Sequence, residues 1–180
     1  MSSSGISQRW YQRKQLFSKH LSADKRSWLF DASSLTARLI RYSSGDFHVE
    51  VLSQEIRRPT LDEAKILQIP PHRFALIRQV HLYCGNQAVV YARTVIPLST
   101  LKDAERSYGT LGNRPLGAML FSDRSMRRDD VMVTQLLPDD ILYEKTGAHG
   151  EAVWGRRSVF RVGGKPLLVS EYYLPVLFSR

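Results

Sequence analysis

Apolar residues alternate with polar ones in two long segments of the chain. Because the side chains of a strand point alternately to the two faces of a sheet, this alternation predicts strands. Segments 74–97 and 154–175 each contain two such runs, which are separated by Gly85–Asn86 in the first and by Gly163–Gly164 in the second. Such pairs are typical of two-residue hairpin loops. The sequence therefore predicts two β-hairpins, whose similar spacing leaves an internal duplication open.

Helical spacing and turn residues predict the other elements. Thr60 followed by Glu63 matches a capping box and predicts the start of a short helix. The remaining predictions are a helix over 24–42 with a break at Ser33–Ser34, a strand over 46–56, the short helix over 61–69, a helical stretch over 99–121 broken at Gly109, Gly112 and Pro115, and one strand in the polar segment 122–153. Hairpins with helices between them predict an α+β fold, with a central antiparallel sheet and flanking helices in a single domain over residues 1–180.

Charged residues interrupt the apolar stripes of both hairpins. Counted back from a two-residue loop, Arg78 faces Arg93 in the first hairpin, and Arg156 faces Glu171 in the second. A charge on a buried strand face is costly unless it is paired or meets a charged ligand. Two arginines directly opposite on one face repel each other, and an anion between them would relieve that repulsion. The residues alone also allow plainer interpretations, a half-exposed Arg78 and a surface salt bridge between Arg156 and Glu171.

The composition narrows the class of protein. The chain has 180 residues, a net charge of +9 and one cysteine, Cys84, so an internal disulfide is excluded and a reducing, cytoplasmic setting is expected. No apolar run approaches the roughly 18 residues that span a bilayer, and residues 1–22 lack the apolar core of a secretory signal. The positive charge favours small anionic ligands. It is spread along the chain with few aromatic residues between basic runs, so neither nucleic acid nor a membrane is expected as a partner.

Motifs for cofactor or metal chemistry are absent from the sequence. There is no P-loop, dinucleotide glycine fingerprint, HExxH, CxxC pair or GxSxG. The five histidines lie far apart without the spacing of metal ligands, so no metal site is expected. Any chemistry is therefore expected to need no cofactor and to depend on charge and shape.

Several short motifs occur together in the hairpins and between them. They are ARTVIP, PLGAMLF, WGRRS and GKPLL, within a similarity that runs from about residue 28 to residue 175. In combination they resemble the bacterial chorismate pyruvate-lyase family of ubiquinone biosynthesis. The resemblance implies a monomeric, cytoplasmic, cofactor-free lyase that converts chorismate to 4-hydroxybenzoate and pyruvate. It also implies an α+β domain in which mobile flaps enclose the ligand.

The resemblance further implies roles for four residues. Arg78 matches the arginine that holds the ring carboxylate, and Glu171 matches the glutamate at the hydroxyl end of the product. Leu116 matches a leucine whose backbone contacts that carboxylate. Leu35 stands where a methionine contributes to the pocket in the enteric enzyme, and an apolar residue of similar volume is expected to be tolerated there. Arg78 and Glu171 are therefore the expected catalytic residues.

Two further arginines complete the expected pocket. Arg93 matches a second arginine of the pocket region, and Arg156, partly balanced by Glu171, adds to a net positive site for a dianion. Glu171 would either orient the 4-hydroxyl group or assist removal of a proton, and the sequence leaves both roles open. Residues 131–152 form a longer segment than the family leads us to expect, and the sequence leaves open what this does to the flap near the pocket.

A ligand sensor is the alternative function. A helix that ends in PPH and hairpins that end in proline are also similar to the UTRA effector-binding domain of GntR-family repressors, which binds small molecules without chemistry. Such domains normally follow a winged helix-turn-helix, and the residues before the first shared strand are too few and too irregular for one. The lyase is therefore the favoured interpretation.

Overall fold

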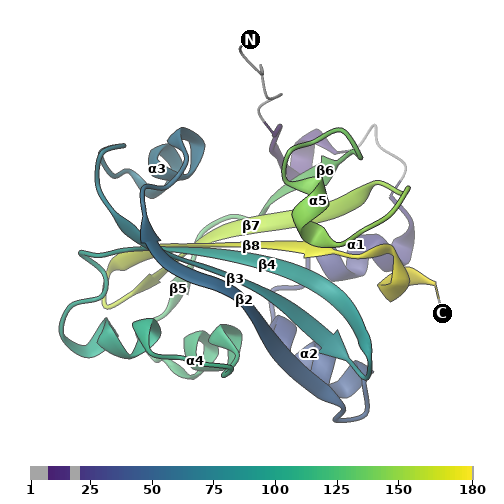
Figure 1. Ribbon diagram of the computed structural model, residues 1–180, viewed down its shortest axis with the longest axis horizontal. Coiled ribbons are helices and arrows are strands. Elements are labelled where there is room, and N and C mark those ends of the chain that lie inside the picture. The colour runs from purple at the N-terminus through teal and green to yellow at the C-terminus, as the bar shows by residue number, and fades with distance from the viewer. Residues whose placement is uncertain (1–7, 17–20, 180) are drawn as a thin grey trace.

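One antiparallel sheet of eight strands forms the centre of the computed structural model, which describes residues 8–16 and 21–179. Seven strands follow the order β1-β6-β7-β8-β4-β3-β2, and β5 pairs with β7 outside that path (Figure 1). The strands are β1 (Tyr11–Gln12), β2 (Phe47–Arg57), β3 (Ala75–Cys84), β4 (Gln87–Pro97), β5 (Arg127–Arg128), β6 (Met132–Leu136), β7 (Val153–Val162) and β8 (Lys165–Tyr173). The helices are α1 (Ala23–Leu29), α2 (Leu35–Tyr42), α3 (Leu61–Leu67), α4 (Leu116–Ser122) and α5 (Tyr143–Thr146), with 3₁₀ turns η1 (Arg13–Gln15), η2 (Asp103–Gly109) and η3 (Pro175–Phe178). The predicted α+β class with a central antiparallel sheet is confirmed.

The hairpin of β7 and β8 has the predicted register. Its loop is Gly163–Gly164, and both glycines have positive φ angles (54° and 75°), which a two-residue loop of this kind requires. Counted back from the loop, Arg156 lies directly opposite Glu171. The prediction for this pair is therefore confirmed.

The hairpin of β3 and β4 has the predicted loop at Gly85–Asn86, but its register changes a few residues further on. Val89 is an extra residue in β4, and the pairing shifts by one position there. Arg78 therefore lies opposite Thr94, and the predicted opposition of Arg78 to Arg93 is wrong. Because side chains alternate along a strand, the bulge also places Arg93 on the other face of the sheet from Arg78.

Two local signals start the helices that the sequence predicts. The break expected at Ser33–Ser34 falls between α1 and α2, and the Ser34 hydroxyl accepts a hydrogen bond from the backbone N–H of Ala37 (3.3 Å). At the start of α3 the Thr60 hydroxyl accepts from the N–H of Glu63, while the Glu63 carboxylate accepts from the N–H of Thr60. Both the break and the capping box are therefore confirmed.

Later segments differ from their predictions. In place of one helical stretch over 99–121, the chain forms η2 and the short helix α4, separated at the predicted breakers. The segment 122–153, which was predicted to hold one strand, holds β5, β6 and α5. β5 has two residues and α5 has four, so neither is long enough to give a periodic signal.

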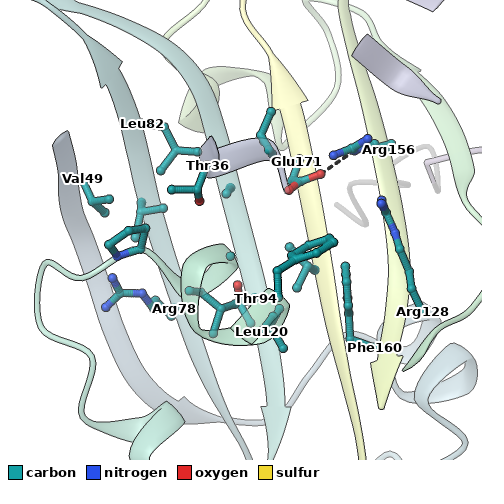
Figure 2. Close-up of a pocket in the computed structure, with 18 residues that line it drawn as sticks. Thr36, Val49, Arg78, Leu82, Thr94, Leu120, Arg128, Arg156, Phe160 and Glu171 are labelled. Atoms are coloured by element: carbon teal, nitrogen blue, oxygen red, sulfur yellow. Dashed lines mark hydrogen bonds and ion pairs between the residues drawn. The ribbon is translucent and has the colours of Figure 1, made fainter. Parts of the chain in front are cut away.

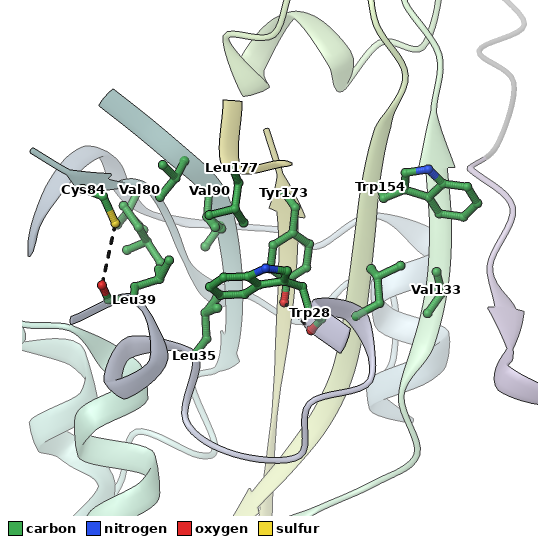
Figure 3. Close-up of a cluster of buried hydrophobic side chains, with 14 of the residues drawn as sticks. Trp28, Leu35, Leu39, Val80, Cys84, Val90, Val133, Trp154, Tyr173 and Leu177 are labelled. Carbon is green, nitrogen blue, oxygen red and sulfur yellow. Dashed lines mark hydrogen bonds between the residues drawn. The ribbon is translucent and has the colours of Figure 1, made fainter. Parts of the chain in front are cut away.

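The helices cover both faces of the sheet. Figure 1 shows α2 and α4 below the sheet, on what we call the cavity face, and α3 and α5 above it, on the opposite face. On the cavity face Leu35 packs in a cluster with Trp28 and Tyr173 (Figure 3). On the opposite face Leu67 of α3 packs with Ile77. Within the described residues no helix is both long and apolar enough to cross a membrane.

Candidate active site

A cavity lies between the cavity face and its two covering helices. Strands β2, β3, β4, β5, β7 and β8 line it from the sheet, and α2 and α4 cover it (Figure 2). The cavity is narrow, with a volume of ≈ 50 Å³. Much of the wall is apolar and consists of Val49, Val80, Leu82, Leu120 and Phe160.

The two covering helices touch each other above the cavity. A Cβ atom added at Gly117 of α4 would lie 2.7 Å from the Oγ1 atom of Thr36 in α2. Only a residue without a side chain allows this approach while Thr36 keeps its position. Leu35 and Leu116, candidate site residues named from the sequence, are the first residues of α2 and α4, and both line the cavity.

Arg78 is a buried cation at one end of the cavity. It is 2% exposed, and its guanidinium donates to the Oε1 atom of Gln54 (3.0 Å) and to the backbone carbonyl of Arg114 (3.3 Å). Both acceptors are neutral, and no carboxylate of the described residues forms an ion pair with Arg78. Burial lowers the pKa of Arg78, but an arginine keeps its charge at neutral pH. Its charge is therefore left for a ligand.

Arg156 and Glu171 form a buried ion pair at the other end (Figure 2). The Nε atom of Arg156 donates to Oε2 of Glu171 (2.5 Å), and Nη1 donates to the carbonyls of Trp28 (3.2 Å) and Asp31 (2.7 Å). Burial acts to lower the pKa of Arg156, but the charge and hydrogen bond of Glu171, together with the charges of Tyr173 and Asp31, outweigh burial and the pKa is raised. Arg156 thus fixes Glu171 and also anchors the chain that leads into α2. The Oε1 atom of Glu171 has no hydrogen-bond partner among the described residues.

Arg128 is a third cation of the cavity, and the sequence did not single it out as a site residue. Its Nε atom donates to the hydroxyl of Ser158 (3.1 Å), its Nη1 atom donates to the carbonyl of Asp31 (3.3 Å), and its guanidinium lies 5.1 Å from the ring centre of Phe160. Burial, followed by the nearby charge of Arg156, lowers its pKa. The signal available in the sequence was the basic pair Arg127–Arg128, but it stands in a polar segment where basic residues are usually exposed.

Arg93 does not belong to this cavity, which corrects the expectation from the sequence. Its side chain lies on the opposite face, where Nε and Nη2 donate to the two carboxylate oxygens of Glu63 (2.6 and 3.0 Å). The bulge at Val89 is the physical reason, because it changes which residues of β4 face the cavity. Arg78, Arg156 and Glu171 are brought together in the lining of this cavity.

The longer segment 131–152 lies away from the cavity. None of its residues lines the cavity. It forms β6 and α5, and Tyr143 of α5 packs with Tyr91 on the opposite face. The extra residues therefore cover the other side of the sheet from the cavity.

The charges of the cavity favour an anionic ligand. Three guanidinium groups line it, from Arg78, Arg128 and Arg156, against the single carboxylate of Glu171. Among the described residues no three side chains of His, Cys, Asp or Glu are grouped as metal ligands would be. The arrangement can bind a carboxylate at the Arg78 end and accept a hydrogen bond at the Glu171 end.

These features define the class, an α+β domain with an enclosed, positively charged site for a small molecule. The chain belongs to the chorismate lyase family, because the model of that family matches residues 6–180. A probable chorismate pyruvate-lyase from Methylococcus capsulatus is 41% identical over 157 residues, which cover 85% of this chain and 96% of that protein. One from Pseudomonas aeruginosa is 34% identical over 175 residues, which cover 95% and 93%.

Solved structures with a similar fold are transcriptional regulators at low identity. PhnF from Mycobacterium smegmatis superimposes with a TM-score of 0.61 at 14% identity, covering 82% of this chain and 66% of that one. A GntR-family regulator from Bacillus cereus gives a TM-score of 0.56 at 14% identity, covering 75% and 96%. At such identities the likeness shows the fold alone, so it does not favour the sensor over the lyase.

Proposed function

We propose that this chain is a chorismate pyruvate-lyase, which converts chorismate to 4-hydroxybenzoate and pyruvate without a cofactor. The proposal rests on the opposite charges at the two ends of the cavity. Arg78 is a buried cation without a carboxylate partner at one end, and Glu171 offers a free carboxylate oxygen at the other. Apolar walls separate the two ends (Figure 2). The relatives named as probable chorismate pyruvate-lyases support the same substrate.

Binding in this proposal uses both ends of the cavity. The Arg78 guanidinium binds the ring carboxylate through two parallel hydrogen bonds, helped by the backbone of Leu116. Leu35 packs against the ring from α2. Glu171 accepts a hydrogen bond from the 4-hydroxyl group. A ligand held at both ends lies in one orientation, which is the main requirement of a reaction that needs positioning.

The reaction is an elimination. The bond between C3 of the ring and the ether oxygen breaks, and the oxygen keeps the electron pair. The proton on C4 leaves, its bonding pair forms the C3–C4 double bond, and the ring becomes aromatic. The released enolpyruvate takes up a proton at its methylene carbon and becomes pyruvate. Because aromatisation supplies the driving force, the site contributes positioning, stabilisation of the leaving oxyanion and exclusion of water.

Glu171 is proposed to orient the 4-hydroxyl group. One of its oxygens is held by Arg156 at 2.5 Å, which fixes the direction of the other. The competing role is that of a base for the C4 proton. Glu171→Gln keeps a hydrogen-bonding group and removes the base, so near-normal turnover in this variant would exclude the base role.

The setting of the reaction is also part of the proposal. We place the enzyme in the cytoplasm, as a monomer of one domain, at the first committed step of ubiquinone synthesis. No nucleic acid or membrane partner is invoked. A non-catalytic sensor on the same fold is the competing function, and it predicts anion binding without turnover.

The test is incubation of the purified protein with chorismate, with both products measured by chromatography. Wild type is expected to form 4-hydroxybenzoate and pyruvate in equal amounts, and Arg78→Ala to lose at least about 100-fold in kcat/KM because a charge-assisted pair is removed. Arg57→Ala, on an arginine with 68% side-chain exposure, is the matched control and is expected to keep full activity. Binding of 4-hydroxybenzoate without any turnover of chorismate would overturn the lyase and favour the sensor.

A further inference from the structure

Arg128 differs from Arg156, its neighbour in the cavity, in how its charge is used. Arg156 pairs with Glu171 and donates to backbone carbonyls of the chain before α2. Arg128 donates only to a serine hydroxyl and one backbone carbonyl, and no carboxylate of the described residues forms an ion pair with it. Its Nη2 atom makes no hydrogen bond within that part of the chain. A charge in a largely apolar cavity without a counter-ion is expected to serve a ligand.

The surroundings of Arg128 hold its guanidinium in place. β5 pairs with β7 so that Arg128 lies opposite Phe160, and the ring of Phe160 supports the guanidinium plane. Ser158 and the carbonyl of Asp31 fix two of its nitrogens. This cation is therefore built into the site in one orientation, whereas a solvated arginine would move freely.

Arg128 lies at the Glu171 end of the cavity, away from Arg78. Figure 2 shows it beside Arg156 and Glu171, while Arg78 stands across the cavity near the end of the pocket lined by α4. Its position allows both Glu171 and Arg156 to affect its pKa through their charges. The cavity thus has one arginine without a carboxylate partner at each end.

We propose that Arg128 binds the second carboxylate of the substrate, the one on the enol ether arm that leaves as pyruvate. The inference rests on the proposed function. In chorismate this arm is attached to C3, next to the carbon that carries the hydroxyl group. With the ring carboxylate at Arg78 and the hydroxyl at Glu171, the arm lies at the Glu171 end, where Arg128 is the arginine without a counter-ion.

This assignment makes Arg128 a residue that distinguishes substrate from product. Chorismate carries two carboxylates, whereas 4-hydroxybenzoate carries one and has no group for Arg128. Arg78 contributes to the binding of both molecules. Arg128 contributes to the substrate alone, and it also faces the negative charge that develops on the departing enolpyruvate.

The test uses two stable ring acids of the same shape. 3-(Carboxymethoxy)-4-hydroxybenzoate has the second carboxylate on an ether arm at C3, and 3-(carbamoylmethoxy)-4-hydroxybenzoate replaces that carboxylate by a neutral amide. Their dissociation constants are measured by calorimetry with wild type and with Arg128→Gln. Wild type is expected to prefer the dianion by about ten- to a hundredfold, the range of one charge-assisted contact, and Arg128→Gln is expected to lose the preference while it binds the amide as wild type does.

Arg127→Gln is the matched control, because it removes the same charge from the neighbouring residue, which is exposed and does not line the cavity. It is expected to keep the preference. If Arg128→Gln does not fold, Arg128→Lys replaces it and is expected to keep part of the preference, with Arg127→Lys as control. An undiminished preference in the Arg128 variants, or equal loss of both ligands, would overturn the inference. Since binding is measured without turnover, failure of chorismate conversion by wild type would count against the proposed function separately.

Discussion

The two faces of the sheet use arginine in opposite ways. On the opposite face two largely buried arginines each have their own carboxylate, since Arg93 pairs with Glu63 and Arg157 pairs with Asp62. On the cavity face three arginines line the cavity with one carboxylate, that of Glu171, which pairs with Arg156. The contrast is visible within one strand, because Arg156 and Arg157 are consecutive residues of β7 that point to different faces.

The difference separates arginines that serve the fold from arginines that serve a ligand. A buried ion pair that is complete within the protein leaves no charge for another molecule, and removal of one partner leaves an uncompensated charge. A buried arginine with neutral partners keeps its charge for an anion that arrives later. Burial alone would assign Arg78 and Arg157 to the same group, since they are 2% and 5% exposed. Their partners, rather than their exposure, distinguish them.

The largest effect is expected from breaking the ion pair between Arg93 and Glu63 on the opposite face. Arg93→Gln leaves Glu63 buried without its cation, so the free energy of unfolding is expected to fall by about 3–5 kcal/mol. The activity of the molecules that remain folded is expected to stay within about two-fold of wild type, because Arg93 does not line the cavity. Urea unfolding and steady-state kinetics measure the two quantities. A large loss of kcat/KM at unchanged stability would return Arg93 to the site.

The next largest expected effect is stabilisation of the folded protein by a ligand bound on the cavity face. At a concentration of about 100 times its dissociation constant, 4-hydroxybenzoate is expected to stabilise the wild type by about 2.7 kcal/mol. Arg78→Ala is expected to lose this stabilisation, because the ring carboxylate loses its partner. Arg93→Gln is expected to keep it in full, although the variant starts from a lower stability. Equal ligand stabilisation of all three proteins would show that the ligand does not depend on Arg78.

The contact between the covering helices gives a smaller effect. Gly117→Ala introduces a Cβ atom that would lie 2.7 Å from Thr36 Oγ1, so α4 or Thr36 must move. Such overpacking costs about 1–3 kcal/mol, and we expect roughly a tenfold loss of affinity for 4-hydroxybenzoate. Thr36→Ala removes the obstructing atom, so the double variant should recover the affinity of Thr36→Ala alone. Additive effects in this double-mutant cycle would contradict the steric explanation.

The smallest expected effect is a pH dependence of the stability that the Glu63–Arg93 pair contributes on the opposite face. Burial acts to raise the pKa of Glu63, but the hydrogen bond and charge of Arg93 outweigh it, so the pKa lies below its ordinary value of 4.5. A carboxylate whose pKa is lower in the folded state stabilises the protein above the unfolded pKa, and this stabilisation is lost as the pH falls through the folded pKa.

The stability difference between wild type and Glu63→Gln should therefore shrink as the pH falls below 4.5. Urea unfolding at a series of pH values measures this difference. Glu55→Gln is the control, because Glu55 is 55% exposed and its ion pair with Arg57 is at the surface. A difference that does not change with pH would show that the carboxylate of Glu63 is not stabilised by its partner.

Much of the fold followed from local signals in the sequence, and one register did not. The loop Gly163–Gly164 gave the opposition of Arg156 and Glu171, because the ladder of β7 and β8 has no irregularity. The bulge at Val89 could not be read from the pattern, since β4 is buried on both faces. In such a strand the side chains on both faces are apolar, so either register buries apolar side chains. The sequence then gives no reason to prefer one register over the other.

The candidate site was predictable to a similar degree. Arg78 and Glu171 interrupt apolar stripes, so the cost of burying a charge made them visible. Leu35 and Leu116 came from the family resemblance, since apolar side chains alone do not mark a site. Arg128 was missed because a strand of two residues has no period and its segment is polar. Its burial arises from β7 and from the chain before α2, which are distant in sequence.

The bulge at Val89 also determines how this hairpin tolerates changes in length. From Val90 onward β4 pairs with β3 on one side and with β8 on the other, whereas Gln87 and Ala88 pair with β3. The bulge at Val89 lies between these two parts of the strand, and the Val89 carbonyl accepts a hydrogen bond from the N–H of Leu174 (2.9 Å). Removal of Val89 would leave Arg78 opposite Thr94. Arg78 would stay on the cavity face, and Arg93 would stay on the opposite face. A change in the length of the hairpin tip is therefore expected to leave Arg78 and Arg93 on their present faces of the sheet.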